Sequence, residues 1–394
     1  MGLKHDLYLS RKPLAGFIAI GVAWSTYFAQ MPVIKANVGA SDGAYGVAIL
    51  VSSLGAIAAM WLAPFCQRVF GGRAVTLGIL LVATGMFASG QSHTLALLVF
   101  GMALAAVGSG VVDVLVNARV SEIEAGSGRT LMNLNHALYS FAYAGGALVT
   151  GALREAQIAT TMIFALLTTA LLLLAWAARD RVPDIEHPGP EKDGIAVNHH
   201  VVLLVGLVVM AAFLAEAASE GWSALHLERT LGGTPGEGAL GPALMGLTMG
   251  IGRLSGHALA RLMRDTTLML VATLVSACGL VVAGLAGSVF VALCGFALAG
   301  LGISVVAPLA LALVGRVVPA KARLAAISRA SVLGYGAFFF GPPLMGLVSQ
   351  SFGLRAAFVV VAVVLGATAV VLIPALARRS GSVQMAARRT DPVI

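Results

Sequence analysis

The sequence of 394 residues is 59% hydrophobic and 11% charged, with a mean hydropathy of +0.93. A soluble domain carries about 25% charged residues, so this composition excludes a protein whose whole surface faces water. The formal net charge of +8 at pH 7 is compatible with nucleic-acid binding, but the positions of the basic residues argue against that function, as shown below.

Twelve apolar runs follow one another along the chain, each close to the roughly 20 residues that cross a hydrocarbon core as a helix. They begin near Pro13, Tyr45, Val75, Leu95, Thr130, Ala156, His200, Ala239, Thr267, Val289, Leu324 and Arg355. A proline-rich, charged segment separates the sixth run from the seventh, and this composition is typical of a solvated linker. We predict an all-α integral membrane protein with a six-helix bundle in 1–178, a cytoplasmic linker in 179–199, a second six-helix bundle in 200–378 and a cytoplasmic tail in 379–394.

The basic residues predict the topology. With the amino terminus in the cytoplasm, nineteen of the 25 Lys and Arg residues fall in cytoplasmic segments, and only Lys35, Arg154, Arg229 and Arg355 fall outside. Short cytoplasmic loops retain positive charge during insertion. Both termini are therefore expected in the cytoplasm, and because topology explains the basic excess, we expect no nucleic-acid partner.

The chain contains few signs of enzyme or metal chemistry. Its three cysteines have neither metal-ligand spacing nor external partners, so we expect no metal and no disulfide. We find no His-Glu-x-x-His, nucleophile-elbow or P-loop pattern in the sequence. We therefore expect no enzyme, no cofactor and no ATP-driven pump, and a transporter would draw its energy from a gradient.

The two halves resemble each other. The stretch from Gly101 to Gly108 reads Gly-Met-Ala-Leu-Ala-Ala-Val-Gly, and the stretch from Gly295 to Gly302 reads Gly-Phe-Ala-Leu-Ala-Gly-Leu-Gly. Such an echo indicates a parallel repeat about an axis along the membrane normal, although small residues also match by chance in apolar helices.

A few ionisable side chains stand within the apolar runs, where charge is costly and usually serves function. They are Asp113, His136, Glu216, Glu220, Arg253 and Arg329. Residues three or four apart share a helix face, which groups Asp113 with Asn117 and groups His136 with Tyr139 and Tyr143. Asp113 and His136 lie at similar depth, so they can meet between the fourth and fifth spans as a proton site, a neutral hydrogen-bonded pair or a gate contact.

For the second half the sequence leaves alternatives open. Glu216 is interpreted as a proton-binding or substrate-binding residue, or as a structural partner of Arg253, which itself can hold a substrate. Glu220 is interpreted as a wetted acid near a helix end, and Arg329 as a residue that reaches the cytoplasmic interface. Gln30 in the first span and Tyr335 in the eleventh are candidate substrate contacts.

The loop after the second span carries a motif at Gln67, Arg68, Gly71, Gly72 and Arg73. It resembles the signature of the major facilitator superfamily, with Gln67 where an acid is usual. The resemblance implies two six-helix bundles that rock around a central cavity, but the missing acid puts the charge contact of that loop in question.

Within that superfamily, the stretches 108–117 and 133–141 resemble fucose permease and its bacterial relatives. The resemblance implies that Asp113 is the proton-titrating acid and that Asn117, Asn133, His136 and Tyr139 lie in or beside a sugar-binding cavity. It also implies a bacterial inner-membrane location. The family's further acid in the first span is not found, because Phe28 stands there.

We therefore expect a secondary transporter that couples uptake of a small polar solute, a sugar or sugar derivative, to protons by alternating access. The partners expected are the small-molecule substrate, protons and membrane lipid, and the protein is expected to act as a monomer. Proton-antiport efflux of drugs or metabolites is the alternative, and a receptor that transports nothing is a third.

Overall fold

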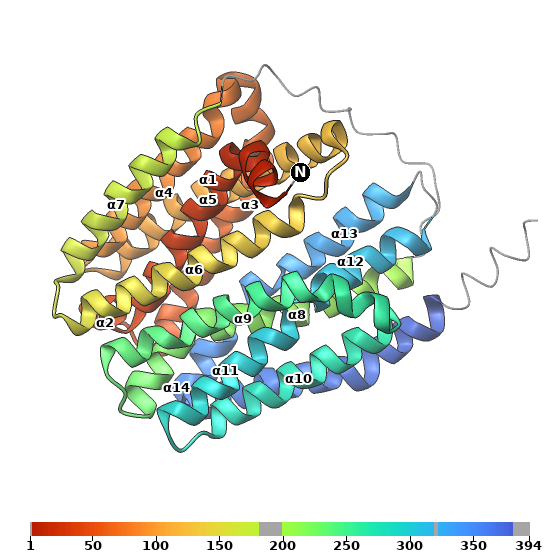
Figure 1. The fold of residues 1–394 in the computed structure, drawn as a ribbon. Coiled ribbons are helices and arrows are strands. Elements are labelled where there is room, and N and C mark those ends of the chain that lie inside the picture. The colour runs from red at the N-terminus through yellow and green to blue at the C-terminus, as the bar shows by residue number, and fades with distance from the viewer. Residues whose placement is uncertain (1, 181–198, 319–321, 381–394) are drawn as a thin grey trace, which may run out of the picture.

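The computed structural model describes residues 2–180, 199–318 and 322–380, and within these ranges every regular element is a helix (Figure 1). The first half contains α1 (Leu3–Ala29), α2 (Met31–Asn37), α3 (Asp42–Phe70), η1 (Gly71–Arg73), α4 (Ala74–Gly90), α5 (Leu95–Ser127), α6 (Met132–Glu155) and α7 (Thr160–Ala177). The second half contains α8 (His199–Leu225), η2 (His226–Thr230), α9 (Pro235–Leu262), α10 (Asp265–Leu285), α11 (Val289–Ile303), α12 (Val306–Val317), α13 (Arg323–Tyr335), α14 (Ala337–Ala367) and η4 (Thr368–Leu372).

The described residues make twelve helical passes, and some passes contain a break. α1 and α2 form one pass bent by 59°. α11 ends before Ser304, which lies four residues before Pro308, and a proline ring excludes the carbonyl of the residue four positions earlier. α14 contains a turn at Gly353, whose φ of +82° lies in the left-handed region that favours glycine. The turn divides α14 between the eleventh and twelfth passes.

Not every pass is equally apolar. By length and composition, seven helical segments of the described chain are long and apolar enough to span a membrane, or eight if the bent pair α1 and α2 is one span. α6 and α9 are not among them, and these two helices pack against each other across the two halves. Their lower hydropathy is therefore compatible with spanning, because their polar residues face protein.

The two halves lie side by side in Figure 1, with α1 to α7 on one side and α8 to α14 on the other. They meet where α6 packs on α9 and where α3 packs on α14. We call the face where the chain starts at Leu3, and where α5 ends, the terminal face, and the opposite face the distal face. Because the number of passes is even, Ser380 also lies at the terminal face.

The sequence echo between the halves corresponds to the same packing in both. A Cβ atom added to Gly101 of α5 would lie 2.9 Å from the carbonyl oxygen of Gly85 in α4. A Cβ atom added to Gly295 of α11 would lie 2.7 Å from the carbonyl oxygen of Gly279 in α10. Helices at this separation tolerate only glycine, so the repeated glycines maintain the same close helix crossing twice.

Two sequence predictions fall partly outside the described residues. Most of the predicted linker at 179–199 and most of the tail at 379–394 are not described, so those boundaries stay predictions. α5 continues past Arg119 as far as Ser127, so Asp113 lies fourteen residues, or about 21 Å, from the end of this helix.

Candidate functional site

A chain of hydrogen bonds connects the polar residues of α5 and α6. Asn117 donates from Nδ2 to Oδ1 of Asp113 at 3.0 Å and to the carbonyl oxygen of Asp113 at 2.8 Å. Its amide oxygen lies 3.1 Å from Nε2 of His136. An amide oxygen only accepts, so the proton of a neutral His136 is assigned to Nε2. Asp113 and His136, which were predicted to lie at similar depth, are thus connected by hydrogen bonds through Asn117.

The second half contributes an ion pair at the same level. Nη2 of Arg253 in α9 lies 3.5 Å from Oε1 of Glu216 in α8. Nη1 of Arg253 donates to Oγ of Ser140 in α6 at 2.5 Å, and Ser140 in turn donates to the carbonyl oxygen of His136 at 3.0 Å. The guanidinium therefore reaches from the second half into the first. The structural pairing of Glu216 with Arg253, one of the two alternatives, is present.

We call these six residues the central polar cluster: Asp113, Asn117, His136, Ser140, Glu216 and Arg253. Both members of the ion pair keep partial exposure, 17% for Glu216 and 18% for Arg253. Hydrogen bonds to charged groups in such surroundings are strong, and breaking them without replacement is expensive. A polar solute that enters here can exchange its own hydroxyl groups for these contacts.

Three predicted tyrosines lie beside the cluster. Tyr139 and Tyr143 follow each other along α6, with ring centroids 6.3 Å apart. Tyr335 of α13 packs on Phe213, with centroids 5.5 Å apart, and lies within electrostatic range of Asp113 and Glu216. Side chains from both halves therefore converge on one region.

Two other predicted residues lie away from the cluster. Gln30 is buried at the bend between α1 and α2, near the distal face, where the hydroxyl of Thr160 lies 3.4 Å from its Oε1. Asn133 lies exposed at the start of α6, at the terminal face. Gln30, a candidate substrate contact, and Asn133, which the resemblance to fucose permease placed in or beside the cavity, thus lie near opposite faces of the protein.

The predicted loop motif forms the turn between α3 and α4. Gln67 is buried, while Arg68 and Arg73 are exposed. Gly71 has a φ of +51°, and the carbonyl oxygen of Gly72 accepts from the amide of Asp180 at 3.4 Å. The motif thus joins the second, third and sixth passes of the first half.

The distal face carries a second set of charged contacts, which the sequence analysis missed. Arg154 of α6 donates to both carboxylate oxygens of Glu228 at 2.6 and 2.9 Å. Arg229 donates to both carboxylate oxygens of Asp42, at the start of α3, at 2.8 and 2.6 Å. We call Asp42, Arg154, Glu228 and Arg229 the distal latch. Of these four residues, only Arg154 and Arg229 were used in the sequence analysis, and only to derive the topology.

Asp42 precedes the second predicted apolar run, which begins near Tyr45, and its neighbours favour the charged form of its carboxyl group. Burial opposes the charge of Asp42, but hydrogen bonds from Arg229, Lys35 and Ser349 outweigh it and hold the pKa of Asp42 well below its usual range. Asp42 therefore stays ionised under physiological conditions.

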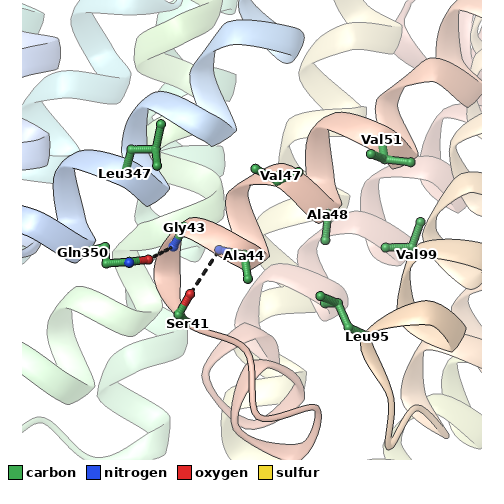
Figure 2. A pocket seen from close by; sticks show the side chains of 10 residues that line it. All are labelled: Ser41, Gly43, Ala44, Val47, Ala48, Val51, Leu95, Val99, Leu347 and Gln350. Carbon is green, nitrogen blue, oxygen red and sulfur yellow. Dashed lines mark hydrogen bonds between the residues drawn. The ribbon is translucent and has the colours of Figure 1, made fainter.

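A recess of about 510 Å³ lies beside the contact between α3 and α14 (Figure 2). Its lining comes from α3, α5 and α14 with the adjacent Ser41, and is mainly apolar. At its edge Gln350 accepts from the amide of Gly43 at 2.8 Å, which adds a further contact between the halves. None of the predicted site residues lines this recess, so it is separate from the central polar cluster.

Comparison with known proteins identifies the family. A sequence model of the Major Facilitator Superfamily matches residues 14–296 and 206–392. The chain belongs to the major facilitator superfamily. The predicted fold class is thereby confirmed, and the protein is a multi-pass membrane protein.

Proteins similar to this chain are known as sequences and as structures. An MFS-type transporter of Yersinia pestis is 29% identical over 363 residues, covering 89% of this chain and 91% of the relative. Membrane protein MosC of Rhizobium meliloti is 24% identical over 349 residues, covering 86% of this chain and 83% of the relative.

Solved structures share the fold at low sequence identity. A bacterial homologue of the human lysosomal transporter Spinster, in an inward-facing and occupied conformation, has a TM-score of 0.74 and 13% identity, over 96% of this chain and 98% of that one. A single-residue variant of the fucose:proton symporter of E. coli has a TM-score of 0.61 and 16% identity, over 95% of this chain and 99% of that one.

Proposed function

We propose that this member of the major facilitator superfamily couples uptake of a small polar solute, a sugar or sugar derivative, to protons by alternating access. In this proposal both termini are cytoplasmic, the distal face is external, and the membrane is a bacterial inner membrane. The structure then represents the state that is closed to the outside, because the distal latch joins the halves at the distal face.

The observation that carries the proposal is the central polar cluster. In the first half, the carboxylate of Asp113 is hydrogen-bonded within the cluster, and in the second half Arg253 forms an ion pair with Glu216. Arg253 also donates a hydrogen bond to Ser140 of the first half. Charges kept at this depth are costly and almost always line a pathway. A purely structural role would not need the partial exposure that Glu216 and Arg253 retain.

Asp113 carries the coupling proton. Its charge is satisfied by Nδ2 of Asn117, and protonation removes that charge, so the amide of Asn117 becomes free to bind a solute hydroxyl. His136 holds the amide oxygen on the other side and so keeps Asn117 oriented. Proton binding and solute binding are thereby linked through one side chain.

Arg253 of the second half binds the solute in this proposal. In the present state it donates to Ser140, which ties α9 to α6 at mid-depth. A solute hydroxyl that replaces Ser140 as the acceptor breaks this contact between the halves, and the halves then become free to rock. Two neighbours in fold, the fucose:proton symporter and a D-xylose–proton symporter, make proton-coupled sugar uptake a chemistry that this fold supports.

The test is proton flux in proteoliposomes that contain an internal pH dye. Addition of a panel of L-fucose, D-xylose and their amino and acidic derivatives should acidify the interior if uptake is proton-coupled. Alkalinisation on addition of a solute would instead establish antiport, the efflux alternative. No proton movement with any solute would contradict the proposal.

Variants then test the assigned residue. Asp113→Asn should abolish uphill accumulation while solute exchange continues, because exchange needs no net proton movement. Glu122→Gln removes an acid from the terminal end of the same helix, where it pairs with Arg119, and should transport as the unchanged protein does. Unchanged accumulation in Asp113→Asn would remove Asp113 from the mechanism.

The orientation can be tested separately in intact cells. Neither Gly287, between α10 and α11, nor Gly126, near the end of α5, has a neighbouring atom within 4 Å of an added Cβ, so each accepts a cysteine. A membrane-impermeant maleimide should label Gly287→Cys in intact cells and Gly126→Cys only after permeabilisation. The reverse result would invert the topology.

A further inference from the structure

The interior around the central polar cluster is unbalanced in charge. In the described residues of this region, three carboxylates, Asp113, Glu216 and Glu220, face one guanidinium, that of Arg253. Arg329, the other basic residue within a predicted span, lies exposed in the middle of α13, in the half of the eleventh pass that is closer to the terminal face. The excess is negative, so an anionic solute is disfavoured here.

Glu220 is the acid whose charge the described neighbours leave unbalanced. It lies one helical turn beyond Glu216 on α8 and is half-buried. Arg253 directs its hydrogen bond and its ion pair to Ser140 and Glu216, and no ion pair forms at Glu220 among the described residues. Glu220 was interpreted from the sequence as a solvated acid near a helix end. In the structure it interacts electrostatically with Tyr139 and Tyr143 of the other half.

Tyr143 supplies a second observation. Its side chain is 1% exposed, and its hydroxyl has no hydrogen-bond partner among the described residues. Buried hydroxyl groups nearly always have a partner, because leaving one unpaired destabilises the protein. Glu220 acts electrostatically on this hydroxyl, so an ammonium group that binds Glu220 on the side of α6 can satisfy it.

Aromatic rings complete the surroundings. The Cε1 atom of Phe28 lies 3.6 Å from the position of an added Cβ at Gly221, the residue after Glu220. Trp24 stacks on Phe28 with ring centroids 5.7 Å apart. A carboxylate beside aromatic rings and a tyrosine hydroxyl is the chemistry that binds a protonated amine, through charge, cation–π contact and hydrogen bonding.

We propose that Glu220, Tyr143 and Phe28 form a binding site for a protonated amine, so that the solute carried is a hydroxylated amine such as an amino sugar. This inference rests on the proposed function and narrows its substrate class. The ammonium group neutralises Glu220 and donates to the hydroxyl of Tyr143, while the sugar hydroxyls take the contacts offered by Asn117 and Arg253.

Selectivity follows from this arrangement. A neutral hexose leaves Glu220 without a counter-charge, and a sugar acid adds a fourth negative charge. A charge-assisted hydrogen bond is roughly twice as strong as a neutral one. The amine should therefore bind at least about ten-fold more tightly than its neutral analogue, a difference of about 1.4 kcal/mol.

The experiment compares matched pairs in the purified full-length protein: glucosamine with glucose, galactosamine with galactose, and mannosamine with mannose. Affinity is measured by ligand-induced thermal stabilisation, and N-acetylglucosamine serves as a ligand that keeps the nitrogen atom but carries it in a larger, uncharged amide. We expect the amine to be preferred at least ten-fold in one pair or more. Equal affinity within the pairs, or no binding by any amine, would overturn the proposal.

Three variants separate a binding role from a structural one. Glu220→Gln should reduce the preference for the amine to below about three-fold while the neutral sugar binds as before, since only the charge is removed. Tyr143→Phe keeps the ring and should weaken the preference less. Glu122→Gln should leave it unchanged. An amine preference that survives in Glu220→Gln would overturn the assignment.

The same pairs in the proton-flux assay distinguish the two proposals. If a neutral hexose drives proton entry and no amine does, proton-coupled uptake holds and the amine site is wrong. If an amine binds with the expected preference and no solute moves protons, the amine site holds and the proposed coupling is wrong.

Discussion

The distal latch offers the sharpest test of the conformational cycle, and Asp42→Asn is the change that addresses it. Asp42 is 6% exposed and receives two hydrogen bonds from Arg229, across the halves, and an ion pair from Lys35 at 2.9 Å. Asparagine keeps the size of the side chain and removes its charge. The variant therefore weakens contact between the halves without opening a cavity.

The free energy that Asp42→Asn removes from the contact between the halves lies between the value for an exposed ion pair and the value for a buried one. Removing one partner of a fully buried pair costs about 3–5 kcal/mol, and an exposed pair contributes about 0.2–1 kcal/mol. Arg229 is 43% exposed, so water replaces part of what it loses, and about 2 kcal/mol is the reasonable expectation. Two kcal/mol is about thirty-fold, so a protein that is closed at the distal face at 99:1 would change to about 3:1.

Spin-label distances report this ratio directly. Labels at Ala36→Cys in α2 and Gly287→Cys, in a background without native cysteines, lie on the two halves at the distal face. We expect a new population at longer distance in Asp42→Asn. Asp265→Asn removes an acid that pairs with Arg316 inside the second half and serves as the matched control. An unchanged distribution in Asp42→Asn, or the same shift in both variants, would refute the reasoning.

Three further predictions follow from the same structure. The pKa of Asp42 is lowered below its usual value of 3.8, so its contribution to closure at the distal face is complete above pH 3.8 and is lost only as the pH falls toward the lowered pKa. In the distance measurement, the difference between Asp42→Asn and the unchanged protein should therefore be the same at pH 8 as at pH 5. Gly85→Ala and Gly279→Ala place a Cβ atom 2.4 and 2.5 Å from backbone nitrogens of the neighbouring helix, and each should lower the free energy of unfolding by about 1–3 kcal/mol. The control Gly145→Ala meets no atom within 4 Å and should leave stability unchanged. Equal melting temperatures for all three variants in thermal unfolding would contradict the predicted helix contact. Asn117→Ala removes the hydrogen bonds that connect Asp113 with His136. Because hydrogen bonds to charged groups contribute about 1.5–3 kcal/mol, proton-coupled uptake should fall at least about ten-fold, with little effect on protein yield. Uptake at the level of the unchanged protein would argue that these hydrogen bonds are only structural.

Sequence reasoning predicted the fold well because a membrane restricts the choices. Backbone groups in lipid must be satisfied internally, so an apolar run of sufficient length becomes a helix whatever its details. The glycine echo was informative for the same reason, since Gly101 and Gly295 mark crossings that only glycine allows. The apolar runs predicted α6 and α9 as well, although both are less apolar than most other passes, and their contact with each other in place of lipid accounts for that lower hydropathy.

The candidate site was predicted only in part. The face shared by Asp113 and Asn117 follows from helix periodicity, and their hydrogen bond agrees with it. Periodicity does not fix the rotation of one helix against another, so Asn117 was not predicted to stand between Asp113 and His136, and Ser140 was not predicted as a partner of Arg253. Contacts between the halves depend on the conformational state, which leaves no periodic signal in a sequence.

Glu228 and Arg229 are consecutive residues in η2, a single π-helical turn, yet they bind opposite edges of the first half, Arg154 in α6 and Asp42 in α3. One local rearrangement of that turn therefore releases both edges simultaneously. Opening at the distal face should be a concerted event with a single relaxation rate, whichever edge carries the reporter, and a half-open intermediate should not accumulate.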